Sequence, residues 1–319
     1  MPSEFELIDK YFRRPTRHTV RGVGDDGAIV QPSPGMELVI STDMLVAGTH
    51  FLPNADPADL GWKTLAVNVS DMAAMGAAPR WALLAAALPA ATESWVAAFA
   101  GSFFECADAF GVDVVGGDTT KGPRNFCVTI FGEVPQGQAL LRSGARPGDE
   151  IWVSGQPGLS ALGLAHLQGR CALEEPALTA CLAALHRPQP RVALGLALRG
   201  LATAAIDVSD GLLADLGHIL EESEAAAVVH FERLPAVALA FGDDSPLARD
   251  CLLAGGDDYE LAFTAPAARH AEVEALAASL RLALTCIGSI ESGAPGQLRL
   301  LENGRPMEQQ RRGFDHFGS

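Results

Sequence analysis

The chain has 319 residues, of which 48% are hydrophobic and 19% are charged, so it is long enough to bury a sizeable core and to form two domains. Its formal net charge of −16 argues against binding to nucleic acid or to an anionic membrane, since both require clustered Lys and Arg. If the protein handles phosphate groups, a bound metal ion has to offset this negative charge.

The sequence carries no sign of export or membrane insertion. The opening MPSEFELIDKYF has acids where a signal peptide has a basic flank, and the longest apolar run, WALLAAALPAA at 81–91, is too short to span a bilayer. The six cysteines are scattered, without a C-x-x-C pair or a neighbouring His, so neither a zinc site nor a disulfide framework is indicated. We therefore expect a cytoplasmic protein with reduced thiols.

Short β-branched apolar runs alternate with amphipathic stretches, which predicts an α/β (α+β) fold. In chain order, the expected strands cover 28–30, 37–42, 81–88, 112–115, 126–134, 150–154, 204–208, 226–231, 260–264 and 283–290. The expected helices cover 58–75, 93–110, 158–168, 176–186, 190–200, 211–222 and 268–280. The polar segment SGARPGDE (143–150) favours a boundary between domains 1–142 and 143–319.

Glycine and aspartate recur together in loops that we expect after strands. These segments are GVGDDGA (22–28), STDML (41–45), VVGGDTTKG (114–122), DVSDG (207–211) and GGDDYE (255–260). Each alone is typical of a turn, and Asp210, with Ser209, also suits the N-cap of the following helix. Asp71 is different, because it lies in the middle of an expected helix, although Asp has a low helix propensity.

Together these segments contain more acids than turns require, and neighbouring carboxylates repel one another unless a cation lies among them. Carboxylate and hydroxyl oxygens favour Mg²⁺ or Mn²⁺, which bind together with substrate phosphates. The adjacent glycines would let phosphates approach main-chain N–H groups. The pattern therefore predicts a metal-assisted phosphate site.

Common nucleotide-binding motifs do not account for these segments. The G-x-G-x-x-G spelling at 22–27 is followed by AIVQPSPG, in which Pro32 and Pro34 prevent the helix that a dinucleotide fold requires. The sequence also has no G-x-x-x-x-G-K-[ST] loop and no H-R-D or D-F-G motif. Arg142 and Lys121 are candidate phosphate contacts, although a surface role fits Lys121 equally well, and His50 suits either a structural role or a substrate contact.

Eight ordered blocks resemble the thiamine-monophosphate kinases over nearly the whole chain. They are GVGDDGA, STDMLVAGTHF, DLGWKTLAVNVSDMAAMGAAPRW, GGDTTKG, LLRSGARPGD, AIDVSDGLLADLGHIL, GGDDYELAFT and GFDHF. The resemblance implies ATP-dependent phosphorylation of thiamine monophosphate to thiamine diphosphate, by direct Mg²⁺-assisted transfer without a side-chain nucleophile. It also implies a two-domain fold similar to aminoimidazole ribonucleotide synthetase, with a mixed-sheet N-terminal domain that forms a homodimer and a C-terminal α/β domain.

The resemblance also implies roles for individual residues. Magnesium would be held by Asp26, Ser41, Thr42, Asp43, Asp71, Asp118, Asp207 and Asp210. ATP would contact Gly117, Asp118, Arg142 and Ser209, and the thiamine substrate would contact His50, Glu260 and Phe314. A carboxylate suits the cationic thiazolium and an aromatic ring suits the pyrimidine. Phe314 stands where the family often has Tyr, and strand alternation indicates that only one of Asp25 and Asp26 faces the phosphates, with Asp26 favoured.

Two alternatives remain. One is another ATP-dependent enzyme of the same superfamily, such as aminoimidazole ribonucleotide synthetase, which the composition does not exclude. The reactive Cys near the N-terminus of selenophosphate synthetases and the C-terminal Cys of hydrogenase-maturation proteins have no counterpart here. The other is a non-catalytic Mg²⁺-nucleotide-binding protein, which we would expect to lack some of the metal-binding acids.

Overall fold

The computed structural model describes residues 6, 8–90, 92–308 and 313–314. They form two compact units, one from residues 1–72 and 77–137 and the other from residues 73–76 and 138–319. The change of unit at 137/138 lies close to the boundary expected at 142/143. Within the described residues, no helix combines the length and the hydropathy needed to cross a membrane.

The first unit is built on a four-stranded mixed sheet of order β3-β6-β4-β5. Its elements are the helical turn η1 (Ile8–Phe12) and β1 (Thr19–Arg21), β2 (Ile29–Val30), β3 (Met36–Val46), α2 (Pro57–Ala74), β4 (Ala78–Leu88), α3 (Glu93–Phe110), β5 (Asp113–Lys121) and β6 (Asn125–Pro135). β4 and β5 run parallel, whereas β6 pairs antiparallel with both β3 and β4. β1 and β2 form a separate two-stranded ribbon.

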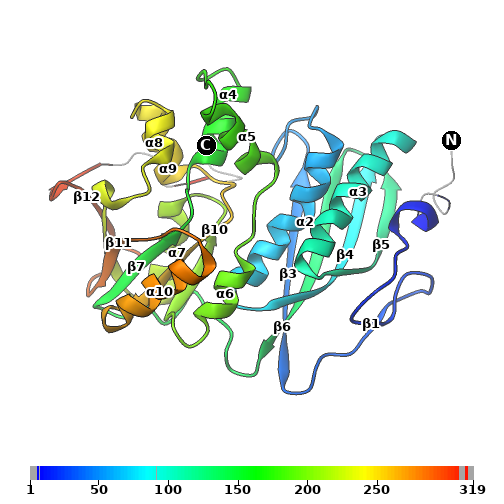
Figure 1. Ribbon diagram of the computed structural model, residues 1–319, viewed down its shortest axis with the longest axis horizontal. Helices are drawn as coiled ribbons and strands as arrows, with labels where there is room; N and C mark the ends of the chain where they lie inside the picture. Colours follow the sequence, from blue (N-terminus) through cyan, green and yellow to red (C-terminus); the bar gives the residue numbers. More distant parts are fainter. Residues whose placement is uncertain (1–5, 7, 91, 309–312, 315–319) are drawn as a thin grey trace. The chain divides into compact units, whose positions relative to one another are not determined.

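Helices α2 and α3 cover the same face of this sheet (Figure 1). Alternate β6 side chains, Phe126, Val128 and Ile130, are fully buried beneath them, and the Phe126 ring stacks on Phe99 of α3 with centroids 4.6 Å apart. On the other face, edge strand β3 exposes Leu38, Ile40 and Met44, at 40%, 59% and 54% of their surface. The sheet of the first unit therefore has one covered face and one open apolar edge.

The second unit has a seven-stranded sheet of order β13-β12-β9-β11-β7-β10-β8. Its strands are β7 (Asp149–Ser154), β8 (Ala204–Val208), β9 (Ala226–His230), β10 (Glu260–Pro266), β11 (Leu284–Glu291), β12 (Leu298–Glu302) and β13 (Arg305–Pro306). Its helices and helical turns are α4 (Leu159–Leu167), α5 (Ala177–His186), α6 (Val192–Leu198), α7 (Leu212–Glu222), η2 (Phe231–Arg233), α8 (Val237–Phe241), α9 (Pro246–Ala254), η3 (Ala267–Arg269) and α10 (His270–Leu280).

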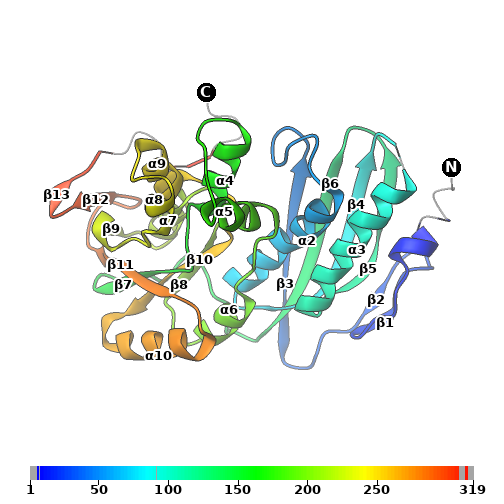
Figure 2. The ribbon, with the colours of Figure 1, turned by 45° about the horizontal axis from the view of Figure 1, so that its top comes forward.

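Both faces of this sheet are covered (Figure 2). One face packs Ile206 and Val208 against Leu212 and Leu216 of α7, and the opposite face packs Phe263 against the side of α6 and α10. Helices α4, α5, α8 and α9 enclose a smaller cluster around Leu162. The alternation of buried side chains along β8 and β10 thus separates two cores, and the turn after β8 is the predicted metal-binding segment DVSDG.

Several elements differ from the sequence expectation. β1, β12, β13, α8 and α9 were not predicted, because the strands are short or only partly buried and the helices have no more than nine residues. β3 and β5 extend beyond their expected ends to Val46 and Lys121. The segments STDML and GGDTTK are therefore largely strand rather than loop, since pairing with β6 and β4 continues through them.

Candidate functional site

The first unit brings two predicted metal-binding residues into direct contact. Ser41 on β3 donates its hydroxyl hydrogen to Asp71 Oδ2 on α2 at 2.6 Å, and the Asp43 main-chain N–H donates to Asn68 Oδ1 on the same helix at 3.1 Å. The alternation of β3 directs residues 41 and 43 towards α2. Asp71 therefore lies within a helix because that position places its carboxylate beside β3, and Asn68 is a site neighbour that the sequence reading missed.

Thr42 faces the other way. Its hydroxyl donates to the Val128 main-chain oxygen at 3.0 Å and lies 3.2 Å from Thr129 Oγ1, on the face of β3 that α2 does not cover. Because successive strand side chains point to opposite faces, the Thr42 hydroxyl lies on the face opposite to the Ser41 hydroxyl. Its predicted role as a metal ligand stays a prediction.

The turn at 22–28 separates its two acids. Asp25 Oδ2 forms an ion pair with the Arg21 guanidinium at 2.9 Å, four residues earlier in the chain. Asp26 and the flanking residues 24–29 are exposed. The ion pair gives Asp25 a structural partner, which is consistent with the preference for Asp26 as the metal ligand.

Gly117 and Asp118 lie in β5 beside β4. Gly117 has φ +150°, and a Cβ at this position would lie 1.8 Å from the Leu84 main-chain oxygen, so only glycine fits. Asp118 pairs with Ala85 in the parallel ladder and is exposed, as is Lys121 at the end of the strand. Glycine here permits close strand pairing, which is a structural role in addition to the predicted ATP contact.

His50 has a defined structural contact in the turn after β3. The Val46 main-chain N–H donates to its ring Nδ1 at 3.0 Å. A ring that accepts through Nδ1 carries its proton on Nε2 when neutral. The contact fixes the ring and its tautomer, and the substrate role of His50 stays a prediction.

In the second unit, the turn after β8 gathers three carboxylates. Asp207 is buried at the end of β8, Asp210 is half-buried, and Asp215 lies on the first turn of α7. Burial, followed by the nearby charges of Asp207 and Asp210, raises the pKa of Asp215 to about 7. The residue preceding α7 is Gly211, and no side chain caps this helix, so the alternative role of Asp210 as its N-cap is wrong.

Arg142 and Phe314 are both tied to this region through their main chains. The Arg142 carbonyl accepts from Ser223 Oγ at 3.1 Å just after α7, and its side chain is exposed. The Phe314 N–H donates to the Asp210 carbonyl at 2.9 Å, which places the start of the GFDHF block beside DVSDG. The Phe314 ring is 44% exposed, and residues 315–317 of the block lie outside the described residues.

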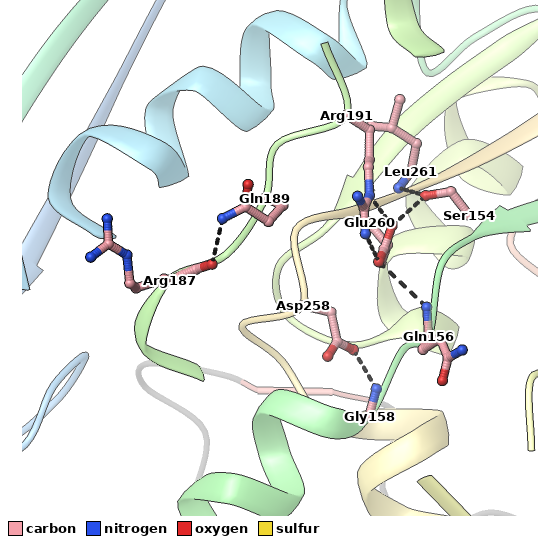
Figure 3. A network of polar contacts seen from close by, with 9 residues as sticks. All are labelled: Ser154, Gln156, Gly158, Arg187, Gln189, Arg191, Asp258, Glu260 and Leu261. Carbon is pink, nitrogen blue, oxygen red and sulfur yellow. Dashed lines mark hydrogen bonds and ion pairs between the residues drawn. The ribbon is translucent and has the colours of Figure 1, made fainter. Parts of the chain in front are cut away.

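Glu260, at the start of β10, is held in a dense polar network (Figure 3). Its two carboxylate oxygens accept from Arg191 Nε at 2.6 Å and Nη2 at 2.5 Å, and Ser154 donates to Oε2 at 2.6 Å. The paired, parallel contacts from Arg191 are the strongest form of carboxylate recognition. Arg191 is a residue that the sequence reading missed, and a cationic substrate at Glu260 would have to approach a carboxylate that already has a cation.

The donor types fit magnesium bound together with phosphates. Within the residues described, no group of three or more His, Cys, Asp or Glu side chains is arranged to hold a metal ion by itself. Mg²⁺ usually takes one or two carboxylates and completes its shell with water and substrate phosphates. The Ser41–Asp71 contact and the crowding of Asp207 and Asp210 around Asp215 supply oxygen ligands of that kind.

Comparisons with known proteins cover both units. The family models for AIR synthase related protein match residues 24–134 with the N-terminal domain and 146–300 with the C-terminal domain. Thiamine-monophosphate kinase of Salmonella typhimurium (strain LT2) is 45% identical over 321 residues, which cover 99% of this chain and 98% of the relative. These matches confirm the expected two-domain fold and the resemblance to thiamine-monophosphate kinases.

Two solved structures extend the comparison. The thiamine-monophosphate kinase from Stenotrophomonas maltophilia K279a matches with a TM-score of 0.85 and 45% identity, covering 96% of this chain and 98% of that chain. AaThiL complexed with AMPPCP and TMP matches with a TM-score of 0.77 and 31% identity, covering 98% of this chain and 97% of that chain. Because sequence and fold agree over essentially the full length, the chain belongs to the thiamine-monophosphate kinase family.

Proposed function

We propose that this protein transfers the γ-phosphoryl group of ATP directly to the phosphate of thiamine monophosphate, which yields thiamine diphosphate and ADP. The observation that carries the proposal is the full-length match at 45% identity to thiamine-monophosphate kinases. A solved relative is described as complexed with AMPPCP and TMP, which supports both substrates. All eight residues predicted to hold magnesium are present in the chain.

The transfer joins two anions, so charge neutralisation and positioning carry the catalysis. When bound, Mg²⁺ supplies the positive charge that lets the two phosphate groups approach each other. In the first unit, the Ser41 hydroxyl orients the Asp71 carboxylate. In the second unit, Asp207 and Asp210 present oxygen ligands from one turn. No covalent step on a side chain is required.

The predicted ATP contacts are Gly117, Asp118, Arg142 and Ser209, and the predicted thiamine contacts are His50, Glu260 and Phe314. The turn before α7 and the exposed Phe314 ring lie close together, because the Phe314 N–H binds the Asp210 carbonyl. This proximity supports a substrate aromatic ring beside the metal-binding turn. The Arg191 contacts favour a role for Glu260 in fixing the Arg191 side chain as well as in touching substrate.

We also propose that the protein is a cytoplasmic homodimer. The six cysteines are all free thiols, which suits a reducing compartment. The apolar side chains of Leu38, Ile40 and Met44 along edge strand β3 form an exposed surface that a second copy would cover. The oligomeric state of the protein in solution, measured by light scattering, tests this part of the proposal.

The activity is tested with the purified protein, ATP, Mg²⁺ and thiamine monophosphate, with thiamine diphosphate as the measured product. We expect product formation that requires Mg²⁺, and a loss of about 10²–10³-fold in kcat for Asp71→Ala, because the variant removes an oriented carboxylate. Nucleotide binding without product would instead support the non-catalytic alternative. Full activity of Asp71→Ala would contradict its metal-binding role.

A further inference from the structure

Three successive main-chain N–H groups of the turn after β8 point at a single carboxylate oxygen. The N–H groups of Ser209, Asp210 and Gly211 donate to Asp215 Oδ2 at 3.0, 3.1 and 3.1 Å. A run of converging N–H groups forms a nest that binds anions, and in many phosphate sites the occupant is a phosphate. Here the occupant is a side chain of the protein itself, from the first turn of α7.

The carbonyl groups of the same turn are also occupied from within the second unit. The Val208 carbonyl accepts from Tyr259 N–H and the Ser209 carbonyl from Asp257 N–H, both at 2.8 Å, and the Asp210 carbonyl accepts from Phe314 N–H at 2.9 Å. The main chain of residues 209 and 210 therefore has internal partners for both its donors and its acceptors. The N–H groups of residues 209–211 are thus not open to a ligand, and the side chains of the turn are its most available binding groups.

With this arrangement, the N–H groups of residues 209–211 are not open to a phosphate. Asp215 is only 2% exposed, so a phosphate cannot reach the nest without displacing a buried carboxylate. The turn is also tightly enclosed, since a Cβ on Gly256 would lie 2.4 Å from the Ser209 carbonyl oxygen. Residues 256–257 and Asp215 therefore pack closely against the main chain of this turn.

We propose that Asp215 is a positioning residue, which fills the nest of residues 209–211 and thereby holds the side chains of Asp207, Ser209 and Asp210 ready for Mg²⁺-nucleotide. The proposal rests on the proposed function for the identity of that ligand. It assigns to Asp215 no direct contact with metal or nucleotide. Asp215 acts indirectly, by fixing the main-chain conformation of residues 209–211.

The test compares Asp215→Asn with Asp215→Ala in the full-length protein. Asparagine keeps an acceptor oxygen for the three N–H groups, whereas alanine leaves them without one. The measurements are the affinity for AMPPCP in the presence of Mg²⁺ and the Mg²⁺ concentration at half-maximal activity. Glu222→Ala is the matched control, because Glu222 is an exposed acid at the other end of α7.

We expect Asp215→Ala to weaken apparent Mg²⁺ affinity by about 10–100-fold, as is usual when the support of a metal ligand is removed. Asp215→Asn should restore most of this affinity, and Glu222→Ala should match the wild type. Equal losses in the Asn and Ala variants would overturn the proposal, because they would indicate a direct ligand. An unchanged Mg²⁺ midpoint in Asp215→Ala would overturn it as well.

A second measurement covers the case in which Asp215→Ala does not fold. Hydrogen exchange of the wild-type protein without ligand should show protected amides at residues 209–211, and rapid exchange there would contradict the proposal. AMPPCP binding and amide exchange do not depend on turnover. If they behave as expected while no thiamine diphosphate forms, the proposed function fails and the positioning role of Asp215 stands.

Discussion

Two turns that each contain glycine and two aspartates, at 22–28 and 207–211, are organised in opposite ways. The turn at 22–28 in the first unit is exposed from residue 24 to 28, and an ion pair joins Asp25 to Arg21 on the surface. The turn at 207–211 in the second unit has its main chain bonded to Asp215, to residues 257 and 259, and to Phe314. Two segments of similar sequence therefore form one solvent-exposed turn and one turn that is fixed by hydrogen bonds within the protein.

The difference has a consequence for binding. A turn whose geometry is fixed before the ligand arrives loses little conformational entropy on binding, whereas an exposed turn loses more. We infer that the 207–211 turn offers a preformed set of oxygen ligands. The 22–28 turn would be ordered by Mg²⁺ and phosphate when they bind.

The largest expected effect distinguishes the two neighbouring acids of the exposed turn. Asp26→Asn should lower kcat by about 10²–10³-fold, because it removes charge that would face the metal. Asp25→Asn should leave activity near the wild-type level, since a surface ion pair such as that with Arg21 contributes about 0–1 kcal/mol. Steady-state kinetics with a Mg²⁺ titration measures both, and a larger loss in Asp25→Asn would reverse the assignment.

A smaller effect is expected from adding one methyl group within the 22–28 turn and one against the 207–211 turn. A Cβ on Gly256 would lie 2.4 Å from the Ser209 carbonyl oxygen, whereas a Cβ on Gly27 has no atom within 4 Å. Gly256→Ala should therefore cost about 1–3 kcal/mol of unfolding free energy through overpacking. Gly27→Ala should be neutral or stabilising by about 0.4–1 kcal/mol, through reduced freedom of the unfolded chain.

Denaturant unfolding of both glycine variants measures these differences. If the turns were equally enclosed, the two alanines would cost the same. Mg²⁺ midpoints measured on the same samples add a second comparison, because Gly256→Ala displaces the acceptor of the Asp257 N–H and should also weaken metal binding.

The sequence predicted the regular elements well where the apolar pattern was long. The strand at 204–208 and the helix at 93–110 agree with the structure to the residue. The strand is buried along its whole length, and the helix repeats buried side chains at helical spacing on one face. Helix α9 was missed although Ser245 precedes Pro246 and accepts from the Ala248 N–H at 3.2 Å, which is an N-cap signal that the short apolar pattern concealed. β13 has only two residues, which is too few for any periodicity.

For the site, the local sequence motifs identified the acidic residues but not the side chains that contact and orient them. The contact of Ser41 with Asp71 joins residues 30 positions apart, and that of Arg191 with Glu260 joins residues 69 apart, so neither is visible as a motif. Asp215 lies inside the quoted block AIDVSDGLLADLGHIL, yet helix periodicity alone gives no reason for an acid to be buried there. Asp215 is buried because it accepts hydrogen bonds from the main-chain N–H groups of residues 209–211. These contacts depend on the folded conformation of the turn.

The smallest expected effect concerns Asp258, a partly buried acid close to the 207–211 turn. Desolvation raises the pKa of the Asp258 carboxyl well above its ordinary value, although a hydrogen bond from the Gly158 N–H at 2.7 Å opposes the shift. A raised native pKa means that the folded state binds more protons than the unfolded state, in which Asp titrates near pH 3.9. The stability that this group contributes is thus complete below about pH 4 and falls as the pH rises towards the native pKa.

Asp258→Asn should flatten this dependence, because the amide can still accept from Gly158 but does not titrate. Thermal unfolding without Mg²⁺ between pH 5 and pH 8 should therefore show a shallower fall of Tm in the variant than in the wild type. Asp215, whose pKa is raised to about 7, leaves part of the slope in both proteins. Glu222→Gln, an exposed acid on α7, is the control and should keep the wild-type slope. Parallel slopes for wild type and Asp258→Asn would mean that Asp258 is ionised in the folded protein, and the enclosure of this side of the turn would then be less complete than the contacts indicate.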